Sequence, residues 1–271
     1  MKHFLISLIC ILTALAMGAC ATTAEPTESP KRLTLPTQER YVIDMAGILN
    51  SAQQDSLRMI LKAYEEESSL HFALVSVADL GGQDLQNLSL EVAKQLKTGQ
   101  PGLNNGGIIL ISMAERLLKV EVNYGLEWQI STNQAADILD SMRDQLGKED
   151  YFGAFKTGFQ GMYEKGKTVS WDIAFPTYTA MKEAGEEAVG KIARIKARGK
   201  TRDYSRVPMD YQFHENLYID LVIGDDTPAR LFFSNYMVEM VNVVVYQDER
   251  AILHARVRKT EPLELEMLGL E

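Results

Sequence analysis

The spacing of apolar residues predicts alternating helices and strands in the first half of the chain. Apolar positions recur at helical spacing in four segments, at about 51–68, 84–97, 132–146 and 151–167. Residues 71–77 and 107–112 are short and almost continuously apolar, as strands buried on both faces are. Residues 117–124 alternate apolar and polar positions, which indicates an antiparallel strand with one wetter face. This order predicts an α/β fold over residues 37–168, a small sandwich with helices on both faces of the sheet.

The pattern changes after Trp171, where strand signals dominate. A short helix is expected at about 178–187, and a helical candidate at 235–240 interrupts the strands that follow. The expected strands cover about 189–198, 217–223, 229–233, 241–246, 251–258 and 263–267. Short strands with one helix between the third and the fourth predict a β-rich C-terminal module over 169–271, of OB type. An α+β roll would give a similar pattern and stays an alternative.

The N-terminus has the features of a secretory signal over residues 1–19. A lysine near the start precedes an apolar run from Phe4 to Ala16, which is too short to span a bilayer with its flanks. The run ends in Met17-Gly18-Ala19-Cys20, which resembles a bacterial lipobox. We therefore expect a lipoprotein with its lipid on Cys20.

Two predictions of location follow from this segment. Residue 21 is alanine and not the aspartate that retains lipoproteins at the inner membrane, so the resemblance implies the periplasmic side of the outer membrane. Cleavage at an ordinary A-x-A site, Ala19-Cys20-Ala21, is the alternative and would release a soluble periplasmic protein. Residues 20–36 lack periodicity and are rich in Thr, Pro and Ala, which indicates a flexible tether.

Composition and charge exclude several classes of function. The 271 residues carry a formal charge of -9 with a pI near 5.1, which argues against a general nucleic-acid binder. Both cysteines, Cys10 and Cys20, lie in the first twenty residues, so the folded part has no cysteine metal site or disulfide framework.

The sequence lacks the motifs of three enzyme classes, which are hydrolases with a nucleophile elbow, zinc proteases and dinucleotide-binding enzymes. The G-x-S-x-G, H-E-x-x-H and G-x-G-x-x-G patterns are missing from the sequence. Residues 161–168 fit the letters of a phosphate loop, but they close a predicted helix, whereas a phosphate loop leaves a strand and opens one. The mature chain has His71, His214 and His254, which are scattered over two modules and are expected to be structural or at the surface.

One edge of the predicted sheet collects carboxylates. If the strands at 71–77 and 107–112 run parallel, Asp79 and the Glu115-Arg116 turn lie at the same carboxyl edge, where open α/β sheets bind ligands. The loop with Asp44 approaches this edge too. Asp44, Asp79 and Glu115 could then give Ca²⁺ or another divalent cation three oxygen ligands, with Arg116 beside them to hold an anion. The ordinary alternative, that these residues cap turns and end strands, is favoured.

Two further groups of polar residues are candidates. A second edge, where the hairpin opens, carries Asn104, Asn105, Tyr124 and Glu127. A basic run in the second module could face an anionic polymer, a lipid headgroup or an acidic partner, or could equally be a solvated strand face. The basic run consists of Lys191, Arg194, Lys196, Arg198, Lys200, Arg202 and Arg206.

Four segments resemble the TPM domain family, named for a thylakoid lumen protein, a photosystem II subunit-like protein and a nematode receptor modulator. They are Tyr41–Leu49, Asn104–Gly106, Glu115–Glu127 and Asp150–Tyr151, and they keep the family's order and spacing. The resemblance implies a Rossmann-like α/β/α domain outside the cytoplasm. It further implies calcium or another divalent ion in some members, a weak acid phosphatase activity, and roles in the repair or assembly of membrane complexes.

The chain departs from the family in three places. Asn123 stands where glycine is usual, Thr98 and Gly99 replace the usual tryptophan region, and a β-rich module replaces the transmembrane helix and glycine-rich tail of many bacterial members. We therefore expect a non-catalytic binding or assembly factor, tethered by lipid, with an unknown envelope or membrane protein as its partner and no nucleic acid. A metal-assisted phosphatase is the alternative.

Overall fold

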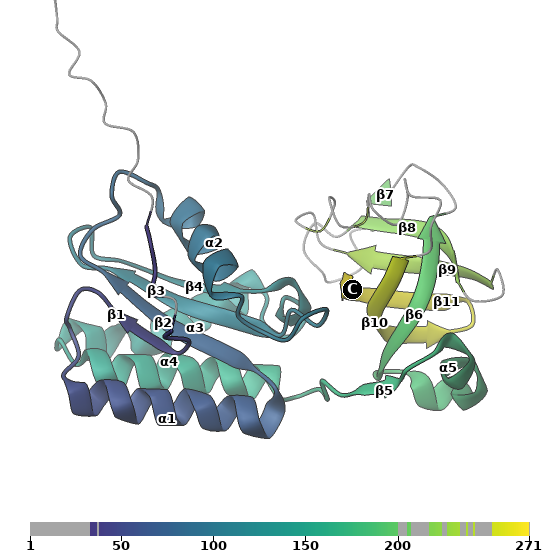
Figure 1. The fold of residues 1–271 in the computed structure, drawn as a ribbon, viewed down its shortest axis with the longest axis horizontal. Coiled ribbons are helices and arrows are strands. Elements are labelled where there is room, and N and C mark those ends of the chain that lie inside the picture. Colours follow the sequence, from purple (N-terminus) through teal and green to yellow (C-terminus); the bar gives the residue numbers. More distant parts are fainter. Residues whose placement is uncertain are drawn as a thin grey trace, which may run out of the picture.

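The computed structural model describes residues 33–36, 38–199, 205–206, 217–223, 227–233, 237, 241 and 251–270. Two modules follow each other along the chain, an α/β module and a β-rich module (Figure 1). Both parts of the predicted fold class are therefore present.

The α/β module is built on a four-stranded sheet. Its strands are β1 (Val42–Asp44), β2 (His71–Val77), β3 (Gly106–Ser112) and β4 (Leu117–Val122), in the order β1-β2-β3-β4. β1, β2 and β3 are parallel and β4 is antiparallel to β3. β1 was not predicted from the sequence, because its three residues are too few to show periodicity. The strand expected to reach Tyr124 ends at Val122, since Tyr124 opens a 3₁₀ turn, η1 (Tyr124–Leu126).

Helices cover both faces of this sheet, as predicted. The four helices are α1 (Ser51–Ser68), α2 (Leu85–Leu96), α3 (Thr132–Gly147) and α4 (Tyr151–Gly166). α1, α3 and α4 pack on one face and α2 on the other (Figure 1). Asn50 and Ser131 begin α1 and α3 with reciprocal capping boxes, which satisfy backbone N–H groups that have no partner inside the helix. The phosphate-loop letters at 161–168 lie at the end of α4, so the motif fails in structure too.

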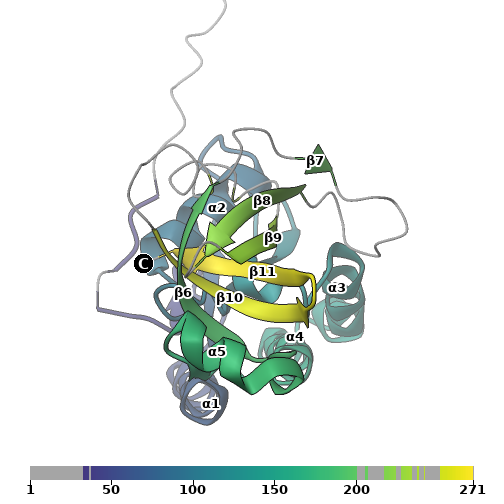
Figure 2. The ribbon, with the colours of Figure 1, turned by 90° about the vertical axis from the view of Figure 1, so that its right-hand side faces the viewer.

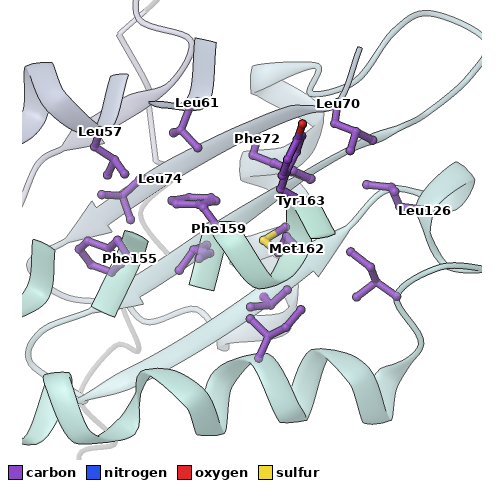
Figure 3. Close-up of a cluster of buried hydrophobic side chains, with 14 of the residues drawn as sticks. Leu57, Leu61, Leu70, Phe72, Leu74, Leu126, Phe155, Phe159, Met162 and Tyr163 are labelled. Carbon is purple, nitrogen blue, oxygen red and sulfur yellow. The ribbon is translucent and has the colours of Figure 1, made fainter. Parts of the chain in front are cut away.

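Aromatic side chains fill the larger core. Phe72 of β2 packs with Phe155 and Phe159 of α4, all fully buried (Figure 3). Each such side chain contributes about 1.5–3 kcal/mol by leaving water. Gly158 lies where α4 meets the sheet, and a Cβ there would come within 2.8 Å of Ile109 Cδ1. Close packing therefore sets how near α4 approaches the strands.

The C-terminal module closes into a barrel. It begins with β5 (Ile173–Phe175), α5 (Tyr178–Ala184) and the 3₁₀ turn η2 (Gly185–Ala188). The strands that follow are β6 (Ile192–Gly199), β7 (Ser205–Arg206), β8 (Leu217–Ile223), β9 (Thr227–Phe233), β10 (Ala251–Thr260) and β11 (Leu263–Leu270). Pairing of β6 with β8 closes the ring β6-β10-β11-β9-β8 (Figure 2), in which only β9 and β11 are parallel.

This ring favours the OB-type barrel over the α+β roll. The barrel is filled by alternate residues of its strands, such as Ile195, Leu253 and Leu265. Met237 and Val241 add to the same core. The rest of the helix expected at 235–240 and of the strand expected at 241–246 lies outside the described residues.

The outer face of β10 and β11 lies against the α/β module. Leu268 belongs to that module's aromatic core, and its carbonyl accepts a 2.6 Å hydrogen bond from Asn104 Nδ2. At Gly102, a Cβ would lie 2.1 Å from His254 Nδ1. Backbone and side chains of the two modules are thus in direct contact. None of the helices in the described part of the chain is long and apolar enough to cross a membrane.

Candidate functional site

The predicted carboxylates lie along one edge of the sheet. Asp44 is the last residue of β1, Asp79 follows β2 by two residues, and Glu115 and Arg116 form the turn between β3 and β4. Because β1, β2 and β3 are parallel, their carboxyl ends share this edge, as predicted from the order of the strands in the sequence.

Asp44 is engaged in holding its own loop. Its Oδ1 accepts hydrogen bonds from the Ile48 N–H (3.1 Å) and the Ser76 hydroxyl, and its Oδ2 accepts from the Leu49 N–H (2.9 Å) and Gln54 Nε2 (3.2 Å). Four donors leave little capacity for a further ligand. The carboxylate therefore fixes the turn that leads from β1 into α1.

Glu115 and Asp79 are both exposed and also serve local turns. Glu115 accepts from the Ser112 hydroxyl and from the Leu80 N–H at 3.2 Å. The Ser112 hydrogen bond, followed by that from Leu80, lowers the pKa of Glu115, so it is not a poised proton donor. Asp79 Oδ1 accepts from the Gly81 N–H at 2.8 Å.

The oxygens of these carboxylates are engaged by donors of the chain itself. No three His, Cys, Asp or Glu residues within the described ranges are placed to hold a metal ion. Arg116 is exposed, has a positive φ of 54°, and forms no ion pair with the residues that the structure describes. The structure thus brings Asp44, Asp79 and Glu115 to one edge but gives their oxygens to backbone and hydroxyl donors.

The residues of the second predicted edge hold the 98–105 loop in place and connect the two modules. Asn105 is buried; its Nδ2 donates to the Ser69 carbonyl (3.0 Å) and its Oδ1 accepts from the Gln100 N–H (2.7 Å). Asn104, at φ 49°, joins the two modules through Leu268. Tyr124 packs against the core of the barrel, and the half-buried Glu127 follows the same turn.

A groove that was not predicted from the sequence opens beside these residues. It has a volume of about 350 Å³ and lies between α2, the 98–101 loop and the end of β4. Its lining includes Leu90, Ala93, Lys94, Lys97, Val122 and Tyr124. Two of the predicted second-edge residues, Asn104 and Tyr124, line it as well. The volume is within the range of ligand and side-chain pockets.

The charge of the groove is positive. Glu121 lines it, but Lys119 Nζ lies 2.5 Å from Glu121 Oε2 and the Ser89 hydroxyl donates to the same oxygen at 3.0 Å. Lys94 and Lys97 are exposed at the end of α2, and neither forms an ion pair with a described residue. Two lysines that no described residue pairs with thus stand over a largely apolar groove.

Only part of this groove had a signal in the sequence. Lys94 and Lys97 at the end of a predicted helix, and the Gly- and Pro-containing loop after them, can be recognised in the sequence. Their approach to Val122 and Tyr124 depends on how α2 crosses the sheet. Asn123 fixes that approach, because its Nδ2 donates to the Thr98 backbone carbonyl and to Thr98 Oγ1 at 3.2 Å.

The basic run and the lipid site are described only in part. Lys191 and Lys196 are exposed and Arg194 is half-buried on and beside β6. Arg198 and Arg206 are placed in strands by their backbone alone. Lys200, Arg202 and Cys20 lie outside the described residues.

The four-stranded sheet covered by α2 on one face and three helices on the other places the first module among small α/β/α sandwiches. Residues 42–165 match the family model described as TPM domain. The first module of this chain is therefore a TPM domain, which agrees with the resemblance seen in its sequence.

Among the solved structures that match part of this chain are two N-terminal domains and the BA42 protein. The N-terminal domain of a protein from P. gingivalis is 25% identical over 48% of this chain and 87% of its own, with a TM-score of 0.44. The N-terminal domain of cg2496 from Corynebacterium glutamicum is 15% identical over 54% and 89%, with a TM-score of 0.39. The BA42 protein of Bizionia argentinensis is 17% identical over 44% and 79%, with a TM-score of 0.36. No curated protein matches the chain.

Proposed function

We propose that this protein is a non-catalytic binding factor of the bacterial cell envelope, which takes part in assembling or repairing membrane or envelope complexes. The observation that carries the proposal is the groove between α2 and β4, with Lys94 and Lys97 over apolar walls. A groove of this kind can bind a ligand without catalysing a reaction. Its one carboxylate, Glu121, is already neutralised by Lys119.

The carboxyl edge supports the same choice. A phosphatase needs a nucleophile or activated water, a charge clamp and a poised acid. Asp44 is occupied by four donors, Glu115 has a lowered pKa, and Arg116 is held by no second residue within the described structure. The metal-assisted phosphatase is therefore the weaker candidate.

The proposal places the protein on the periplasmic side of the outer membrane. This part rests on the lipobox-like Met17-Gly18-Ala19-Cys20 alone. In the membrane fraction, intact-mass analysis should find an acylated N-terminal cysteine, and Cys20→Ala should move the protein into the soluble periplasm. An unlipidated mature protein beginning at Thr22 would contradict the anchor.

Site-specific photo-crosslinking in intact cells tests the binding role. A photoreactive residue in place of Gln100, exposed at the rim of the groove, should give a discrete adduct with an envelope component. The same residue in place of Lys62, exposed on α1 at the opposite face of the sheet, serves as the control. Absence of an adduct at position 100, or the same adduct from both positions, would overturn the proposal.

A further inference from the structure

The TPM domain leaves one long strand edge unpaired beside its groove. β4 pairs with β3 on one side, and no backbone hydrogen bond joins its other side to a described residue. The opposite edge strand, β1, has three residues, whereas β4 has six. Short edges are poor templates for strand pairing, while a longer edge offers a row of N–H and C=O groups. Leu117, at the start of β4, is 41% exposed.

The groove lies at the other end of the same strand. Glu121, Val122 and the two residues that follow line it, so a chain running along β4 would pass directly over it. Side chains of a paired strand alternate in direction, and every second one would face α2. Leu90 and Ala93 of α2 provide an apolar surface there. The apolar lining suits an apolar side chain of such a chain.

The positive charge at the groove indicates which kind of peptide could pair with β4. Lys94 and Lys97 add two positive charges at the groove, whereas the whole chain carries -9. Lysines in the last turn of a helix ordinarily offset the helix dipole. Here they also stand at the mouth of an apolar groove beside a free strand edge, a combination that the dipole does not require. The net charge of the chain disfavours pairing with a second copy of itself.

From this juxtaposition we infer that the free edge of β4 and the groove beside it bind an extended acidic peptide segment of a partner protein. The peptide adds a strand to β4, an apolar side chain enters the groove, and its carboxylates face Lys94 and Lys97. Main-chain hydrogen bonds supply affinity in this mode, and the pocket supplies specificity. The inference rests on the proposed function and names the chemistry of its partner.

Fluorescence anisotropy with the full-length protein tests the inference. The probe is a labelled peptide that alternates leucine and glutamate, and the controls replace glutamate with lysine or methylate alternate backbone nitrogens. We expect saturable binding of the acidic probe that weakens with added salt, and weak or no binding of both controls. Equal binding of acidic and lysine probes, or none at millimolar acidic probe, would overturn the inference.

A matched pair of variants locates the site. Lys94→Glu with Lys97→Glu should weaken binding of the acidic probe by about tenfold or more. Lys165→Glu with Lys148→Glu makes the same charge change at the end of α4 and the C-cap of α3, away from the groove, and should leave binding unchanged. Equal losses in both double variants would show a general charge effect and contradict the site. Circular dichroism checks that each variant is folded.

Two results separate this inference from the proposed function. An envelope adduct at position 100 together with no acidic-probe binding keeps the binding role and rejects the acidic peptide. Binding of the acidic probe without any adduct in cells keeps the acidic-peptide site and rejects the binding role in the envelope. A dimer in analytical ultracentrifugation that the probe cannot dissociate would assign β4 to a second copy and overturn the inference.

Discussion

Arg256 and Glu266 face each other across β10 and β11 as a buried ion pair at the junction of the two modules. Arg256 Nη1 lies 2.9 Å from Glu266 Oε1, and the two side chains are 5% and 3% exposed. Arg258 adds a 3.4 Å contact to the other oxygen. The guanidinium of Arg256 also lies 5.0 Å from the ring of Trp171, which follows α4. The charged Arg256 of the barrel thus contacts Trp171, which lies next to the TPM domain.

Breaking this pair on one side should destabilise the protein strongly. Glu266→Leu removes both the charge and the hydrogen-bond acceptor that face Arg256, so the guanidinium stays buried and unpaired, which we expect to cost about 3–5 kcal/mol in the free energy of unfolding. Replacing both residues, Arg256→Met with Glu266→Leu, should restore most of that loss because no buried charge remains. Urea unfolding measures both. A double variant as unstable as the single one would contradict the account.

Stability should also depend on pH through Glu266. Burial, opposed by Arg256 and Arg258, raises the pKa of Glu266 to about 7. A carboxyl group whose folded pKa is raised contributes stability that is complete below its unfolded pKa and is lost as the pH rises through the folded value. This contribution should therefore fall as the pH rises from about 4.5 to about 7.

The test compares unfolding free energies of variants across this pH window. Glu266→Gln should lack this part of the slope, whereas Glu264→Gln, on the same strand, should keep it. Parallel pH profiles for the wild type and Glu266→Gln would show that Glu266 titrates at an ordinary pKa.

The contact at Gly102 should tolerate no side chain. Gly102 has a φ of +77°, and a Cβ there would meet His254 of the barrel at 2.1 Å. Gly82 has a similar φ of +80° with nothing within 4 Å. Gly82→Ala should cost about 1–2 kcal/mol from backbone strain alone. Gly102→Ala should cost a further ~1–3 kcal/mol by overpacking the junction. Equal melting temperatures would contradict the contact.

Calcium binding at the carboxyl edge stays a prediction from the sequence. If Asp44, Asp79 and Glu115 hold calcium, millimolar calcium should raise the melting temperature of the full chain by mass action. Asp44→Ala should abolish the rise, but it also removes an acceptor from four donors and so lowers stability without metal. Asp79 is exposed, so Asp79→Asn tests the loss of a calcium ligand separately from the loss of stability that Asp44→Ala causes without metal. No calcium-dependent shift in the wild type would remove the site.

Phosphatase activity should be feeble and independent of Arg116. Arg116 is exposed and lacks an ion-pair partner within the described structure, so it is not held to clamp a phosphoryl group. With a generic phosphate monoester, Arg116→Ala should leave any rate nearly unchanged, whereas a true clamp would cost on the order of a hundredfold. Robust turnover that collapses in both Arg116→Ala and Asp44→Ala would reverse the choice of function.

The sequence predicted most of the fold because each long element carries its own periodicity and caps. Residues 51–68 were predicted and found as α1, with Asn50 as its cap. The run at 71–77 was predicted as a buried strand, and every residue of β2 is buried. β1 was missed because its three residues acquire strand geometry only by pairing with β2.

The sequence by itself determined the α/β sandwich, the β-rich module after it and the shared edge of Asp44, Asp79 and Glu115, because local periodicity and the direction of parallel strands suffice for these. Tertiary structure alone decided what those groups do. Asp44 received its donors from Ser76 and Gln54, which lie on other elements. The groove, the free edge of β4 and the Arg256–Glu266 pair exist only where separate elements meet, and such contacts leave no periodic signal along the chain.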